Sequence, residues 1–119
     1  VSTQPQLIAR LTTTLADRLW AMTRQMANTQ IKENLHKLLD MIALQVEKNK
    51  VNCGKGYTYE LNLSIYDLAK MCVIPLEEQS SALNQLMHDP RVRIDGNKIF
   101  IKDCYELVNS AALFRKQSR

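Results

Sequence analysis

The stretch SIYDLAKMCVIPLEEQSSALNQLM, residues 64–87, has the pattern of two short helices joined by a tight turn. Ser64 suits the N-cap of the first helix, and Asp67, three residues on, resembles the partner in a capping box. Apolar spacing predicts that this helix buries Leu68 and Met71, with Cys72 as a further candidate. The turn then falls at residues 72–74, and the pattern predicts a helix-turn-helix.

The second helix of this unit is expected to begin at Pro75, because the first helical position does not need an amide proton. It is expected to run to about His88 and to bury one apolar stripe, which consists of Ala82, Leu83 and Leu86. A DNA-reading helix usually carries Arg, Lys or Asn near its start. This one carries two carboxylates instead, Glu77 and Glu78. The sequence therefore raises the question of whether the unit reads DNA.

Short β-strands are expected on both sides of the helix-turn-helix. Residues 57–63, YTYELNL, alternate apolar and polar side chains as a strand does. Residues 91–103, RVRIDGNKIFIKD, alternate on both sides of Asp95-Gly96-Asn97, which is a strong hairpin-turn sequence. Asp103 is then expected to cap a last helix that extends through Phe114.

A long helix is expected at the start of the chain, where Pro5 precedes QLIARLTTTLADRLWAMTRQMAN. Its apolar residues recur every three or four positions, and a helix of about 23 residues is ~35 Å long, more than a small domain needs. Ile8, Leu11, Leu15 and Met22 fit the alternating seam positions of a heptad repeat. Arg18 and Gln25 interrupt this repeat. We therefore predict a dimer interface that consists of Ile8, Leu11, Leu15, Leu19, Met22 and Met26. The alternative is that this stripe packs on the core of its own domain.

The next helix is expected to be capped by Thr29 and to reach about Lys48, with a wide apolar stripe from Ile31 to Val46. The predicted organisation is thus a dimerisation helix over residues 1–28 and a winged helix-turn-helix over residues 29–119. In fold class this is a mainly α protein with a small β-wing.

Composition excludes several functions. The 119 residues are 45% hydrophobic and carry a net charge of +4. No apolar run approaches the roughly 18 residues that cross a bilayer. The three cysteines lack zinc-site spacing, so we expect no metal and reduced thiols, as in the cytoplasm. The cations clustered after residue 90 favour a polyanionic partner, although a solvated surface explains them almost as well.

Three stretches together resemble the C-terminal half of the catabolite-activator (cyclic-AMP receptor) superfamily of bacterial transcription regulators. PQLIARLTTTLADRLWAMTRQMAN is similar to its dimerisation helix, NLSIYDLAKMCVIPLEEQSSALNQL to its helix-turn-helix and RIDGNKIFIKD to its wing. Each motif is weak alone, but the three occur in the family's order and separations. The resemblance covers nearly the whole chain.

The resemblance implies a DNA-binding transcriptional regulator that acts as a homodimer in the cytoplasm, with RNA polymerase as a further partner. It also implies that the chain is a fragment without an N-terminal sensor domain, which would bind a cyclic nucleotide or another small effector; this fragment itself is expected to carry no cofactor. Cyclic-AMP-binding members contact the nucleotide base through a Thr-Ser pair, and the matching residues here are Met22 and Thr23. Only Thr23 keeps a hydroxyl group.

The DNA-contacting residues follow from the same resemblance. The family's recognition helix reads bases with an Arg-Glu pair and a later Arg, and the matching residues are Leu76, Glu77 and Ser81. Only the glutamate is kept, and a carboxylate can accept from cytosine N4. The expected base-facing residues are Leu76, Glu77, Gln79, Ser80, Ser81 and Asn84. The expected phosphate contacts are Ser64, Lys70, Arg93, Asn97 and Lys98.

Two departures from the family pattern concern shape: Val73 stands in the turn where glycine is usual, and Gln79 occupies an inward-facing apolar position. A buried amide at that position would need a hydrogen-bond partner. The alternative function is a helix-turn-helix that has lost DNA and serves as a protein-interaction or dimerisation module, for which an exposed Leu76 would be suited. An enzyme is not expected, because no phosphate-binding glycine loop and no nucleophile–base pair is visible.

Overall fold

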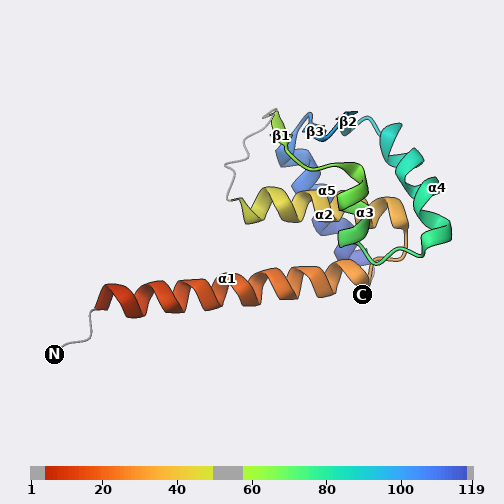
Figure 1. Ribbon diagram of the computed structural model, residues 1–119. Helices are drawn as coiled ribbons and strands as arrows, with labels where there is room; N and C mark the ends of the chain where they lie inside the picture. Colours follow the sequence, from red (N-terminus) through yellow and green to blue (C-terminus); the bar gives the residue numbers. More distant parts are fainter. Residues whose placement is uncertain (1–4, 50–57, 118–119) are drawn as a thin grey trace.

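The chain is described by a computed structural model that covers residues 5–49 and 58–117, with side chains from residue 14 onward. The described part is mainly helical and contains a three-stranded antiparallel sheet (Figure 1). Its elements are α1 (Pro5–Thr29), α2 (Asn34–Lys48), β1 (Tyr59–Leu61), α3 (Ile65–Met71), α4 (Leu76–Met87), β2 (Val92–Asp95), β3 (Lys98–Ile101) and α5 (Cys104–Gln117).

Helix α2 is the centre of the packed body. It contacts α1, α3, α4 and α5, and its residues from Leu38 to Leu44 are all buried. The core around it is formed by apolar side chains from every element of the body, including Leu68 of α3, Leu86 of α4, Ile99 of β3 and Leu107 of α5. Burial of this kind, at roughly 25 cal/mol per Å² of apolar surface, holds α3 and α4 in place.

Local signals define several of the element boundaries. Ser64 Oγ accepts a hydrogen bond from Asp67 N (3.1 Å), which confirms Ser64 as the N-cap of α3. Asp103 Oδ1 accepts one from Glu106 N (3.1 Å) at the start of α5, as predicted. The hairpin between β2 and β3 is also confirmed, with Asp95 opposite Lys98 and Gly96 at φ +57°, where glycine avoids the strain that a side chain would meet.

The sheet has the order β1-β3-β2, so a short strand that precedes α3 pairs with the hairpin that follows α4. Tyr59 lies opposite Ile101, and Leu61 opposite Ile99. The strand predicted over residues 57–63 is shorter in the structure, and Tyr57 lies outside the described residues. Pairing with β1 places the hairpin beside the start of α3.

Two sequence predictions about helices are wrong. Thr29 does not cap α2: it is the last residue of α1, and its Oγ1 donates to Met26 O (2.7 Å), while α2 begins only at Asn34. Met71 is not in the core but is 36% exposed at the end of α3. α3 ends at Met71, and the next residue, the C-cap Cys72, is the one that turns into the core, where it is 4% exposed.

Helix α1 packs on the body only near its C-terminal end and projects beyond it (Figure 1). Arg24 and Asn28 are the buried residues of its described side chains. Contacts therefore cross the predicted domain division at residue 28, and the last turns of α1 belong to the packed body. None of the described helices combines the length and apolar character that crossing a membrane requires.

Candidate nucleic-acid interface

Helix α4 presents a polar face to solvent. Ala82 and Leu86 are buried against the core, as predicted, whereas Leu83 is only half-buried beside them. The side chains on the opposite side of the helix are exposed; they are Glu77, Ser80, Ser81 and Asn84. Leu76, the first residue of the helix, is 81% exposed. Five of the six predicted base-facing residues therefore lie on the open surface.

Gln79 is the exception among the predicted base-facing residues. It is half-buried, and its Nε2 donates to Ile74 O (3.2 Å) in the turn before α4. This bond supplies the partner that an amide in an inward position requires. Gln79 thus fastens the start of α4 to the turn, and a base contact would require that bond to be given up.

The two carboxylates at the start of α4 have different surroundings. Glu78 Oε1 accepts from Asn34 Nδ2 (3.1 Å), so this side chain is turned toward the start of α2. Glu77 lies on the exposed polar face. Both occupy the first turn, where negative charge is favourable beside the helix N-terminus. The acidic start of α4 therefore has a structural reason, and of its two carboxylates Glu77 is the one on the exposed polar face.

Ser81 lies at the edge of the polar face. Together with Glu78 and Gln85 it lines a surface hollow of about 560 Å³ against the residues that begin α2. Ser80 and Asn84 do not line this hollow. The polar face is therefore centred on Glu77, Ser80 and Asn84, with Ser81 at its border.

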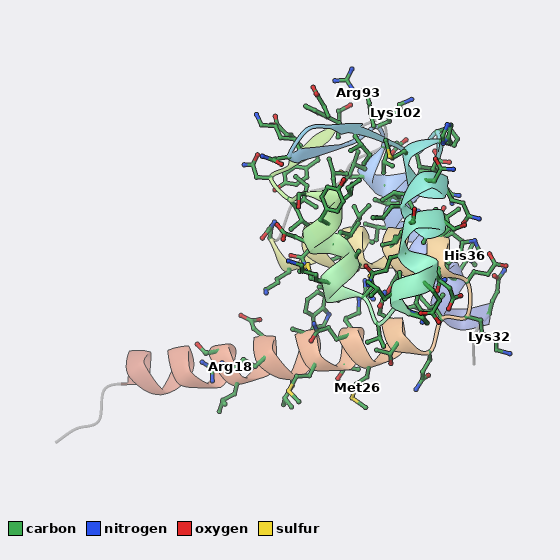
Figure 2. The ribbon with its side chains drawn as sticks, turned by 45° about the vertical axis from the view of Figure 1, so that its right-hand side comes forward. Arg18, Met26, Lys32, His36, Arg93 and Lys102 are labelled. Atoms are coloured by element: carbon green, nitrogen blue, oxygen red, sulfur yellow. The ribbon has the colours of Figure 1, made fainter. Side chains whose placement is uncertain are left out.

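The hairpin carries cations that neighbouring side chains of the sheet hold in place. Lys98 Nζ lies 2.7 Å from Glu60 Oε1 across the sheet, and the hydrogen bond to Glu60 raises the pKa of Lys98 above its usual value. The guanidinium of Arg93 lies 4.7 Å from the centre of the Phe100 ring, its cross-strand neighbour. Arg93 and Lys102 extend from the end of the body opposite to α1 (Figure 2).

A hollow between the hairpin turn and the start of α3 brings three predicted phosphate contacts together. Its volume is about 420 Å³, and its lining includes Ser64, Asn97 and Lys98. A hydroxyl, an amide and an ammonium group can all donate to a phosphate oxygen. Asp67 lines the same hollow, and its carboxylate would oppose an anion. Lys70 and Arg93, the other two predicted phosphate contacts, are exposed but lie outside this hollow.

The exposed side of α1 carries an apolar stripe. Leu15, Leu19, Met22 and Met26 are 58–64% exposed, and their spacing of four, three and four residues is that of consecutive seam positions in a heptad. We call these four residues the α1 seam. Met26 points away from the body (Figure 2). In this register neither Arg18 nor Gln25 interrupts the seam.

The remaining predicted residues of α1 are Ile8, Leu11 and the effector-contacting pair. The side chains of Ile8 and Leu11 lie outside the described residues. Of the predicted effector-contacting pair, Met22 belongs to the α1 seam, and Thr23 Oγ1 donates to Leu19 O (2.8 Å) within the helix. Both residues are exposed.

A buried charged cluster joins α1 to the body, and sequence reasoning missed it. Asp40 of α2 has a fully buried carboxylate that accepts from Arg24 Nη1 (3.2 Å), from Arg115 of α5 and from Asn28 Nδ2 (3.0 Å). Arg24 also pairs with Glu47, and Asn28 Nδ2 donates to Lys37 O (2.9 Å). The available signal was the position of Asp40, a single acid inside the apolar run LLDMIAL. A buried carboxylate needs charged partners.

Cys72 lies in the core under the turn between α3 and α4. Its Sγ is 3.6 Å from Lys37 O, and burial, with a further contribution from Asp40, raises the pKa of its thiol to about 12. Such a thiol stays protonated and unreactive at neutral pH. The described residues hold no cluster of three or more His, Cys, Asp or Glu side chains suited to a metal ion.

No family model, no curated protein and no solved structure matches this chain.

Proposed function

We propose that this chain is a sequence-specific DNA-binding transcriptional regulator, a winged helix-turn-helix that acts as a dimer through α1. The observation that carries the proposal is the arrangement of α4 and the hairpin. Helix α4 follows a tight turn and exposes Glu77, Ser80 and Asn84. The β2–β3 hairpin, with Arg93 and Lys98, is the wing of this arrangement.

The geometry supports a division of labour on DNA. Phosphate contacts give much of the affinity and need only cations, amides and hydroxyls. Ser64, Asn97 and Lys98 supply these three groups around one hollow. Base contacts give specificity, and a carboxylate such as Glu77 accepts from cytosine N4 in the major groove. The wing thus supplies the phosphate contacts, and with them the affinity, that a recognition helix without a cation cannot supply.

Affinity should be modest, because carboxylates oppose the phosphates. Lys98 is paired with Glu60 and must exchange this partner for a phosphate, and Asp67 faces the same hollow. We expect fluorescence anisotropy with a labelled duplex to show binding that weakens steeply with added salt. Binding that is absent at low salt would contradict the proposal.

Replacing both Arg93 and Lys98 with alanine should weaken binding to every DNA sequence alike. Each lost phosphate contact should reduce the slope of log affinity against log salt by about 0.9. A salt titration of anisotropy on two unrelated duplexes measures both effects. Glu60→Gln serves as a comparison with the opposite expected effect. It should strengthen binding to both duplexes, because Lys98 loses its carboxylate partner. Unchanged slopes in both variants would place the DNA contacts elsewhere.

Glu77→Ala and Glu78→Ala should affect different properties: the first should change base discrimination, and the second should change affinity for all DNA sequences. Loss of Glu77 should relax discrimination at one base pair by about 1–3 kcal/mol, because its carboxylate lies on the exposed face. Loss of Glu78, which Asn34 holds, should strengthen binding to all sequences about equally by removing one negative charge. Competition assays with a panel of single-base-pair variants measure the difference. Equal effects of the two changes on discrimination would remove Glu77 from base reading.

A protein-interaction module is the second candidate function, and the exposure of Leu76 favours it. This side chain is 81% exposed at the head of α4, and Val73 in the preceding turn is 66% exposed. Apolar side chains at these positions suit a protein surface better than a DNA groove. A chain that dimerises but shows no salt-dependent DNA binding would favour this second function.

A further inference from the structure

An apolar groove lies between α1 and the turn that precedes α4. Its volume is about 360 Å³, and it is lined by Met22, Gln25, Met26, Thr29, Met71 and Val73. Met71 is 36% exposed and Val73 is 66% exposed, although most residues of their type are buried in folded domains. We call this feature the turn groove.

The turn groove is continuous with the α1 seam, because Met22 and Met26 belong to both. A helix that lies along the α1 seam therefore also covers one wall of the groove. The other wall consists of Met71 and Val73, which belong to α3 and to the turn. Methionine side chains are flexible and adapt well to an incoming helix.

We infer that a second copy of this chain fills the turn groove, so that the dimer interface extends from the α1 seam to the turn that positions α4. The inference rests on the proposed dimerisation through α1. It adds a contact between one copy's turn and the partner's α1.

The size of the α1 seam favours this extended interface. Its four side chains span about 17 Å of helix, from residue 15 to residue 26. These four residues are far fewer than the roughly 20–30 residues per partner that form a stable interface of about 800 Å² per partner. Met71 and Val73 enlarge the apolar surface next to it. A self-complementary helix stripe also matches a second copy better than an unrelated protein.

The consequence is a physical link between dimerisation and the orientation of α4. Val73 lies in the turn between α3 and α4, and the amide of Gln79 fastens α4 to the carbonyl of Ile74 in the same turn. A partner helix against Val73 would hold this turn in one conformation. By reciprocity, DNA binding to α4 should strengthen the dimer.

The test compares three variants by sedimentation equilibrium: Val73→Glu in the turn, Leu19→Asp in the α1 seam and Met87→Glu at the far end of α4. We expect Val73→Glu to weaken the dimer by about tenfold or more, because an apolar contact becomes a buried charge. Met87 is 55% exposed and lies outside the groove, so Met87→Glu should leave the dimer unchanged. Circular dichroism of each variant checks that it folds.

Photo-crosslinking gives an independent readout. A chain with benzoylphenylalanine at position 73 is mixed with isotopically heavy wild-type chain, and the crosslinked peptides are identified by mass spectrometry. We expect light–heavy crosslinks to α1 residues of the heavy chain. If Leu19→Asp dissociates the dimer while Val73→Glu does not, or if position 73 crosslinks only within its own chain, this inference is wrong and the α1 dimer stands. A wild-type chain that stays monomeric at high micromolar concentration overturns both the turn-groove contact and dimerisation through α1.

Discussion

Asp40→Asn is expected to lower the free energy of unfolding by about 3–5 kcal/mol, the cost of leaving buried charges without their partner. The carboxylate is fully buried and accepts from Arg24, Arg115 and Asn28. Its replacement leaves two guanidinium groups in the interior with Glu47 as the remaining acid of the cluster. Urea unfolding followed by circular dichroism measures the change.

Asp95→Asn is the matched control for this prediction. Asp95 is exposed at the hairpin turn, and Asn-Gly is as good a turn sequence as Asp-Gly, so the change should be within about 0.5 kcal/mol. If the cost at position 40 comes from unpaired cations, adding Arg115→Met to Asp40→Asn should cost less than the sum of the two single changes. An Asp40→Asn variant as stable as wild type would show that the cluster contributes little.

The second large effect is expected for Leu19→Asp, which should convert the dimer to a monomer. Each of two copies loses the burial of a leucine, worth about 1.5–3 kcal/mol, and gains a charge in the seam. The dimer should therefore weaken by a factor of at least about 100. Sedimentation velocity over a concentration series measures this, and DNA affinity for a two-half-site duplex should fall with it.

Leu113→Asp on α5 is the control for this variant, because Leu113 is an exposed leucine, 57% against 64% for Leu19, outside the α1 seam. It should sediment as the wild-type chain does. A Leu19→Asp chain with the same mass as the wild type, whether both are dimers or both are monomers, would contradict dimerisation through the α1 seam.

Helix caps and hairpin turns could be predicted from short stretches of sequence. Ser64 and Asp103 accept the capping bonds expected of them, and Asp95-Gly96 makes the expected hairpin turn. Each of these features depends on residues within a few positions of one another. Thr29 shows the limit of such signals, because a threonine before an apolar stripe can cap one helix or end another.

Features that depend on distant residues could not be predicted in the same way. The pairing of β1 with β3 joins segments about 40 residues apart, and the Asp40–Arg115 contact joins segments 75 apart. Spacings of three and four on α1 fit more than one stripe, so the sequence could not decide which side of the helix meets the body. Among the described side chains of α1, the buried residues Arg24 and Asn28 mark that side.

The candidate site was predicted by resemblance, and the geometry refines it residue by residue. Glu77, Ser80 and Asn84 lie on the exposed face of α4, while Gln79 and Glu78 are engaged by Ile74 and Asn34. These two hydrogen bonds depend on how the turn and α2 pack against α4. The sequence alone could state only that an amide at position 79 would need a partner.

Binding-site selection from a random duplex library is the sharpest test of DNA reading by α4. The intact chain is incubated with the library at moderate salt, and the bound duplexes are recovered and sequenced over several rounds. We expect enrichment of two inverted half-sites about one helical turn apart. One C·G pair should be preferred at a position in each half-site, and Glu77→Ala should weaken that preference. A library that shows no enrichment for the dimeric chain would contradict DNA reading by α4.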